Sequence, residues 1–369
     1  MKNFKNINLG IGLCLLVFML SKCKEAELPG PINFADLVEQ DETPYALEIG
    51  EFPEPDFGDN PLTVEGATLG RMLFYEKMLS KDNSISCGSC HLQDHGFSDP
   101  DQFSEGVGGS LGKRQAMSVF NTAWHTNEFF WDGRAHLLRD QSLMPIQDEL
   151  EMDETLDNVI EKLSEEDKYK IQFIKVFGDE QITSERMSLA LEQFMNSIVS
   201  NQSKYDQVLA GKATFSDSEK RGRDLFFGEY NPAFPEESGA DCAHCHGRIN
   251  FSNSRYMNNG LDSEAGQDDI GRQEVTGDPN DKAKFKVTTL RNIELTAPYM
   301  HDGRFATLEE VVDHYNDGII VSPTIDPALE YTTQTGLMLT DQDKADLIAF
   351  LKTLTDETLA TDERYSDPN

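Results

Sequence analysis

The sequence predicts an all-α protein made of two similar domains, one in each half of the chain. Three observations support this prediction. Apolar residues recur at helical spacing in several segments, and no run is convincing as a sheet strand. A pentapeptide with two cysteines and a histidine occurs once in each half, and each copy is followed by an Asp-Gly-Arg motif. A length of 369 residues suits two domains with sizeable cores.

The two pentapeptides are Cys87-Gly88-Ser89-Cys90-His91 and Cys242-Ala243-His244-Cys245-His246. Two thiols three residues apart can form thioether bonds to the two vinyl groups of one haem, and the following histidine then reaches the iron. A single C-x-x-C is also typical of a zinc knuckle or a redox dithiol, but the histidine after both copies favours haem. The sequence therefore predicts two cytochrome c-like domains. Each holds one covalent c-type haem through Cys87, Cys90 and His91 or through Cys242, Cys245 and His246.

Residues 1–22 are predicted to be a lipoprotein-type signal peptide, because two lysines precede an apolar run that is short for a membrane span. Leu20-Ser21-Lys22-Cys23 resembles a bacterial lipoprotein signal, in which Cys23 is lipidated. Lys22 is not the small residue usual there, so cleavage without lipidation and a retained anchor stay open. Haem attachment occurs outside the cytoplasmic membrane, which agrees with a periplasmic, lipid-anchored protein. The proline-rich, acidic residues 23–61 predict a tether and an extended lead-in.

The remaining cysteines and the charge exclude several functions. Cys14 lies in the signal, Cys23 lies at its end and the other four cysteines belong to the haem motifs, so no pair is left for a disulfide. The formal net charge of −34 argues against nucleic acid or an anionic membrane surface as a partner. Solubility is the simple explanation of this charge. A docking field for a basic electron-donor protein is the functional one, and it would make association salt-dependent.

The N-terminal domain is predicted over residues 62–205. Thr63 begins a helix that runs to about residue 76, with Leu69, Leu73 and Phe74 facing inward. Residues 104–114 hold four glycines and are expected to form a loop. Helices follow at 155–163 and 184–200, and the second has one apolar face: Met187, Leu191, Phe194 and Ile198.

The C-terminal domain is predicted over residues 206–355, followed by an acidic tail at 356–369. Capping boxes at Ser216 and Thr307 begin two helices, and the second stops near Gly318. Residues 229–282 form a long loop that we expect to wrap a cofactor. Thr340 begins the last helix, whose buried stripe is Leu347, Phe350, Leu351 and Leu354.

The Asp-Gly-Arg repeat links the two halves. Phe130-Trp131-Asp132-Gly133-Arg134 follows the first pentapeptide, and Met300-His301-Asp302-Gly303-Arg304 follows the second. An Asp-Gly pair favours a turn that brings the preceding side chain to a fixed place. That side chain is an indole in the first half and an imidazole in the second.

Several motifs occur together in one order: Cys87–His91, Phe130–Arg134, Gln141-x-x-x-Pro145, Glu151-Met152, Cys242–His246, Leu290-Arg291-Asn292 and Pro298–Arg304. With them, the chain resembles the bacterial di-haem cytochrome c peroxidases and their relative MauG over roughly residues 60–355.

The resemblance implies that the first haem is the peroxidatic one and the second the electron-transfer one. It places Glu151 and Gln141 over the open iron and Trp131 between the haems as an electron relay. From spacing alone, Glu151 is one member of an acidic run, so its role rests on the resemblance. A buried carboxylate with a raised pKa can take a proton from bound peroxide and return it to the leaving oxygen.

The resemblance also implies a calcium ion between the domains, held by Gln115 and by the carbonyls of Thr296 and Pro298. Gln115 stands where the family usually has asparagine. Members of the family are often homodimers, but no helix pattern here indicates an interface.

Two positions depart from the classical peroxidases. Val107 replaces a histidine that blocks the resting peroxidatic iron, so we expect an open first haem that reacts with peroxide without prior reduction. Tyr315 replaces the methionine ligand of the second haem and matches the MauG branch, and a phenolate lowers the reduction potential. His314, Met300 and Met338 stay open as alternative ligands.

The favoured function is reduction of hydrogen peroxide to water with electrons from a small periplasmic cytochrome c or cupredoxin. MauG-like oxidation of a partner protein or an organic substrate is the first alternative. The second alternative is a non-catalytic electron-transfer cytochrome.

Overall fold

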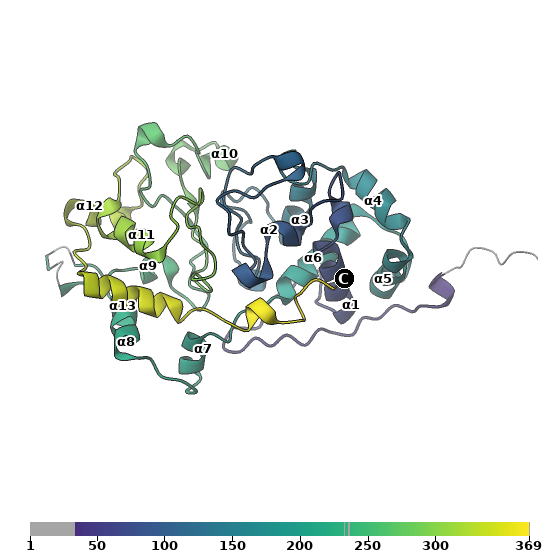
Figure 1. The fold of residues 1–369 in the computed structure, drawn as a ribbon, viewed down its shortest axis with the longest axis horizontal. Helices are drawn as coiled ribbons and strands as arrows, with labels where there is room; N and C mark the ends of the chain where they lie inside the picture. Colours follow the sequence, from purple (N-terminus) through teal and green to yellow (C-terminus); the bar gives the residue numbers. More distant parts are fainter. Residues whose placement is uncertain (1–33, 232, 235–236, 369) are drawn as a thin grey trace, which may run out of the picture. The chain divides into compact units, whose positions relative to one another are not determined.

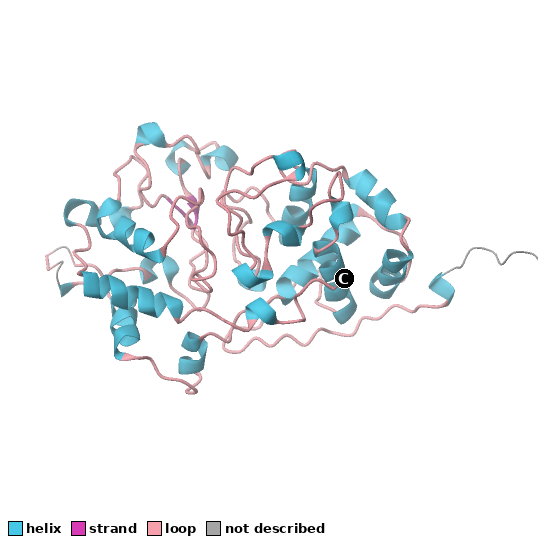
Figure 2. Ribbon diagram, in the orientation of Figure 1, coloured by secondary structure: helices cyan, strands magenta, loops and turns pink. Residues whose placement is uncertain are grey.

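The computed structural model describes residues 34–231, 233–234 and 237–368. Helices joined by long loops make up these residues, and the only named strands among them are the two-residue antiparallel pair β1 (Tyr256–Met257) and β2 (Phe285–Lys286) (Figure 2). The predicted all-α fold class is therefore confirmed. None of the helices in the described part has the length and apolar character that crossing a bilayer requires.

The N-terminal half is built around the packing of α1 on α6 (Figure 1). The Thr63 hydroxyl accepts a hydrogen bond from the Gly66 amide at the start of α1, as its capping role predicts. The residues predicted to face inward on both helices are buried. The helices of this half are α1 (Val64–Phe74), α2 (Cys87–Cys90), α3 (Leu138–Gln147), α4 (Leu156–Ser164), α5 (Asp167–Phe177) and α6 (Ser184–Ser197).

The C-terminal half is built around the packing of α8 on α13 (Figure 1). The capping boxes at Ser216, Thr307 and Thr340 are all formed. The chain continues from α11 into a π-helix, His314–Gly318, which carries Tyr315. The helices of this half are α7 (Lys204–Leu209), α8 (Asp217–Phe227), α9 (Ala243–His246), α10 (Gln273–Thr276), α11 (Leu308–Asp313), α12 (Thr332–Thr335) and α13 (Asp341–Lys352).

The main helix pair of each half crosses closely at a glycine. A Cβ atom at Gly70 of α1 would lie 1.9 Å from the carbonyl oxygen of Ala190 on α6. A Cβ atom at Gly222 of α8 would lie 1.8 Å from the carbonyl oxygen of Asp346 on α13. The backbones touch at both points, so only glycine fits, and the two halves repeat one packing arrangement.

The break between the two hydrophobic cores lies slightly before the predicted boundary at 205/206. That boundary falls inside α7, and the ring centroid of Tyr205 lies 5.0 Å from that of Phe251 in the C-terminal core. Ser203 caps α7, so the helix and its cap belong with the C-terminal half.

The segments at the two ends of the described chain pack against the two halves. Residues 356–369, expected as an acidic tail, are acidic, but Leu359 and Tyr365 are buried in the N-terminal core beside α1 (Figure 1). In the predicted lead-in, the described residues 37–61 form no helix, and Phe52 packs against Trp124 in a tilted arrangement with ring centroids 4.5 Å apart. The predicted signal peptide and Cys23 lie outside the described residues.

Candidate haem sites

Each pentapeptide presents its histidine to a cavity in the same way. The Nδ1–H of His91 donates to the carbonyl of Phe97 at 3.0 Å, and that of His246 donates to the carbonyl of Phe251 at 3.1 Å. This bond fixes each ring and leaves Nε2 for a metal. Burial lowers the pKa of both imidazoles, which favours the neutral form that binds iron.

The residues around both cavities fit a covalent haem. Cys87, Cys90, Cys242 and Cys245 are free thiols. Cys90 and His91 line a first cavity of about 1200 Å³, whereas Cys242, Cys245 and His246 line a second, largely apolar cavity of about 250 Å³. Thiols, an oriented imidazole and a cavity occur together twice, which is the donor set that a c-type haem requires.

Glu151 and Gln141 line the first cavity together with His91. The side chain of Gln141 comes from α3, and Glu151 comes from the turn that follows this helix. Burial and the nearby Asp148 carboxylate raise the pKa of Glu151, although the charge of Arg134 opposes the shift. Sequence motif and structure thus bring an amide and a carboxyl group to the same cavity as the proximal histidine.

The glycine-rich loop holds the Glu151 segment by its backbone. The amide of Val107 donates to the carbonyl of Glu151 at 2.8 Å, and the amide of Met152 donates to the carbonyl of Pro145 at 3.2 Å. The Val107 side chain is not among the residues that line either cavity. The loop therefore fixes the acid without placing a ligand in the cavity.

Trp131 lines both cavities. Its indole N–H donates to the carbonyl of Gln115 at 2.8 Å, and its ring centroid lies 6.5 Å from that of His301. The two Asp-Gly-Arg turns close in the same way: Phe129 N–H donates to Ala135 O at 2.7 Å, and Tyr299 N–H donates to Phe305 O at 2.8 Å.

The three residues expected to hold calcium also line the second cavity. The Gln115 amide donates to the Ser98 hydroxyl and to the Asp99 carbonyl at 3.0 and 2.9 Å, and its own carbonyl accepts from Trp131. These hydrogen bonds engage the side-chain amide nitrogen and the backbone carbonyl of Gln115. Calcium binding by Gln115, Thr296 and Pro298 stays a prediction.

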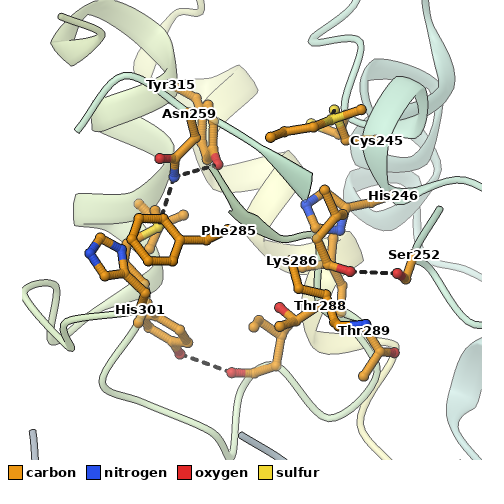
Figure 3. Close-up of a pocket in the computed structure, with 18 of the residues that line it drawn as sticks. Cys245, His246, Ser252, Asn259, Phe285, Lys286, Thr288, Thr289, His301 and Tyr315 are labelled. Atoms are coloured by element: carbon orange, nitrogen blue, oxygen red, sulfur yellow. Dashed lines mark hydrogen bonds between the residues drawn. The ribbon is translucent and has the colours of Figure 1, made fainter. Parts of the chain in front are cut away.

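Across the second cavity from His246 lie a phenol, an amide and a thioether (Figure 3). The amide N–H₂ of Asn259 donates to the Tyr315 hydroxyl and approaches the Met300 sulfur, both at 3.3 Å. Burial raises the pKa of Tyr315 to about 12, and the Asn259 hydrogen bond opposes this shift. No motif in the sequence pointed to Asn259, which lies in the long loop between the haem motif and the turn.

The other two ligands left open by the sequence are placed differently. His314 donates from Nε2 to the Asn259 carbonyl at 3.0 Å and does not line the cavity. Met338 is half exposed and lies outside the lining as well. Tyr315 and Met300 are therefore the two candidates that the cavity contains.

Comparison with known proteins identifies the family of this chain. Residues 64–214 match the family model described as di-haem cytochrome c peroxidase. The MauG protein of Methylophilus methylotrophus is 32% identical over 301 residues, which cover 80% of this chain and 84% of the relative. This chain belongs to the di-haem cytochrome c peroxidase and MauG family. Membership implies two c-type haems and a haem-dependent oxidoreductase.

Two further relatives lie on different branches of the family. The cytochrome c551 peroxidase of Nitrosomonas europaea is 37% identical over 256 residues, covering 69% of this chain and 73% of the relative. A crystal structure of a MauG-like protein associated with microbial copper homeostasis superposes with a TM-score of 0.76 at 36% identity, covering 88% of this chain and 99% of that one. The family is therefore shared, but the relatives divide between peroxidases and MauG-type proteins.

Proposed function

We propose that the protein reduces hydrogen peroxide to water with electrons from a small cytochrome c or cupredoxin. The observation that carries the proposal is the joint presence of Glu151, Gln141 and His91 at the first cavity. When bound, the haem supplies an iron that accepts peroxide and delivers electrons to it. The overall reaction consumes one peroxide, two electrons and two protons and yields two molecules of water.

The protein groups supply proton transfer and orientation. Glu151 takes the proton from one peroxide oxygen and returns it to the oxygen that leaves, so that it leaves as water. Its raised pKa lies closer to neutral pH than that of an ordinary glutamic acid, which suits a group that must first accept a proton and then return it. The Gln141 amide can hold the peroxide by hydrogen bonds without taking part in proton transfer.

The test is oxidation of a reduced small cytochrome c by peroxide. Wild-type protein should turn over many equivalents of donor, and Glu151→Gln should not. If the wild-type holoprotein oxidises no donor in the presence of peroxide, the peroxidase proposal fails.

The second candidate is MauG-like oxidation of a partner protein or an organic substrate. Tyr315 favours it, because a phenolate ligand would lower the potential of the second haem and make electron acceptance from a donor less favourable. A peroxide-oxidised protein that persists without consuming donor would support this candidate.

The third candidate is a non-catalytic electron-transfer cytochrome, and electron paramagnetic resonance of the resting ferric protein tests it. If the protein showed only low-spin signals that peroxide does not change, it would be a simple electron carrier.

We further propose that the protein is exported to the periplasm and held at a membrane by a lipid on Cys23. Labelling with a radioactive fatty acid, compared between wild type and Cys23→Ser, tests the anchor.

We also propose that the protein forms a homodimer and that Gln115, Thr296 and Pro298 bind calcium. Sedimentation with and without a calcium chelator tests both.

A further inference from the structure

Lys286 lies in the wall that the two haem cavities share. It is the second residue of β2, it is only 4% exposed, and it lines both cavities together with Trp131 and His125. Its backbone amide donates to the carbonyl of Trp131 at 2.7 Å. The side chain is therefore fixed directly beside the residue that is expected to connect the two haems.

The ammonium group of Lys286 is hydrogen-bonded to a backbone carbonyl and not to a carboxylate. Its ammonium group donates to the backbone carbonyl of Glu128 and lies 5.2 Å from the ring centroid of Tyr256. The Glu128 carboxylate is engaged elsewhere, by Arg272 at 3.3 Å and by the Tyr256 hydroxyl at 3.2 Å. No ion pair of Lys286 occurs in the part of the chain that the structure describes.

The neighbouring groups make this part of the wall positive. Burial lowers the pKa of Lys286 to about 8, the charge of Glu128 opposes this shift and that of Arg272 adds to it, so the side chain is still largely protonated at neutral pH. Burial and the charge of Lys286 lower the pKa of His125 to about 4, so the imidazole is neutral. Arg272 adds a second cation whose charge is shared with Glu128. Lys286 and Arg272 thus share the single carboxylate of Glu128, and a buried cation that lacks an ion pair of its own favours the binding of a further anion.

We propose that Lys286 binds a haem propionate at the wall between the two cavities. In a c-type haem the vinyl groups are bonded to cysteines, and the two propionates leave the porphyrin from the opposite edge as carboxylates. Figure 3 shows Lys286 on a side of the second cavity away from Cys245. An ammonium beside a propionate stabilises the ferrous state relative to the ferric state, because it offsets negative charge near the iron.

The experiment compares two substitutions at Lys286 with a matched control in the holoprotein. Lys286→Gln keeps an N–H donor for the Glu128 carbonyl but removes the charge, and Lys286→Met removes both. Lys284→Gln is the control, because Lys284 lies two residues earlier, pairs with Asp281 at 3.3 Å and lines neither cavity. Spectroelectrochemistry measures the reduction of both haems, and resonance Raman spectroscopy measures the propionate bending bands.

We expect Lys286→Gln to lower the ferrous-to-ferric ratio of at least one haem about tenfold at a fixed applied potential, since the lost charge acts through an effective dielectric constant of about 20. The propionate band of the same haem should shift as well. The control Lys284→Gln should change neither the ferrous-to-ferric ratio nor the propionate band. Lys286→Arg keeps the positive charge, so both quantities should match those of the wild type.

Unchanged potentials and propionate bands in Lys286→Gln, with both haems attached, would overturn the proposal and leave Lys286 a purely structural donor to Glu128. If Lys286→Met fails to fold, Lys286→Gln still decides the matter, because it keeps the structural hydrogen bond. The outcome does not depend on whether peroxide or a partner protein is the substrate.

Discussion

The two haem cavities begin with the same attachment unit and end with different chemistry. Both use a C-x-x-C-H motif, both orient the histidine through a backbone carbonyl, and both are followed by an Asp-Gly-Arg turn of the same hydrogen-bonding pattern. In the cavity of His91, which is the larger one, the chain places a carboxyl group and an amide. Opposite His246 it places a phenol and a thioether in a narrow one.

This difference shows where function is decided in a duplicated protein. The repeated elements, including the glycine crossings of α1 with α6 and of α8 with α13, set the position of the cofactors. The segments that differ are the turn after α3 in the first half and the π-helix after α11 in the second. Changes in these segments alter chemistry without disturbing attachment, so each prediction below changes one side of the comparison and leaves the other as a reference.

The largest effect is expected from removing the acid of the first cavity. Glu151→Gln should slow the reaction with peroxide by about 10²–10⁴-fold, the usual contribution of a positioned acid-base group. Stopped-flow absorbance measures this rate. Glu161→Gln, which changes an exposed acid of α4 that lines neither cavity, is the control and should react like wild type.

A comparable change in the second cavity should alter potential rather than peroxide chemistry. Tyr315→Met should raise the reduction potential of the second haem, within the span of about 0.8 V that axial ligands cover, because a thioether stabilises ferrous iron better than a phenolate does. Spectroelectrochemistry checks it. An unchanged potential would show that Tyr315 is not a ligand and would leave Met300 as the candidate.

A smaller shift of opposite sign is expected at Asn259. Asn259→Leu removes the hydrogen bond to the Tyr315 oxygen. A phenolate without that donor is a stronger ligand for ferric iron, so the potential of the second haem should fall, by an amount that matches one hydrogen bond of about 0.5–1.5 kcal/mol. Asn280→Leu, in the same loop but exposed and outside both cavity linings, provides the comparison.

The smallest effect concerns pH. Because the pKa of Glu151 is raised, its carboxylate becomes protonated at a higher pH than that of an ordinary glutamic acid. As the pH is lowered, the rate of reaction with peroxide should therefore fall at this higher pH. Asp148→Asn removes a negative charge that raises this pKa, so the acid limb of the pH–rate profile should move to lower pH. A limb that stays in place would show that another group controls it.

Local sequence signals predict much of the fold. The parts that these signals miss are missed for physical reasons. The caps at Thr63, Ser216 and Thr340 give the helix starts, because side-chain oxygens satisfy free amides there. The helix α3 was not predicted, since Pro145 lies inside it and is normally a helix breaker. The predicted boundary at 205/206 falls inside α7, whose Tyr205 packs against the second core, and no local signal marks this contact.

The residues of the candidate sites also divide into those that the sequence predicts and those that it does not. The haem-attachment residues follow from spacing, because covalent attachment has a fixed local geometry. Glu151 and Gln141 required the resemblance to a family, since an acidic residue in an acidic run has no distinguishing pattern. Lys286 and Asn259 escaped both approaches, because their roles depend on neighbours that are distant in sequence, such as Glu128 and Tyr315.

The C-terminal segment has a consequence for how the protein matures. Leu359 and Tyr365 complete the core that surrounds the first haem motif, and Gln93, just after that motif, donates to the Leu359 carbonyl at 2.9 Å. The first cavity therefore acquires its full packing only after a segment 266 residues farther along the chain has been synthesised and has folded back onto it.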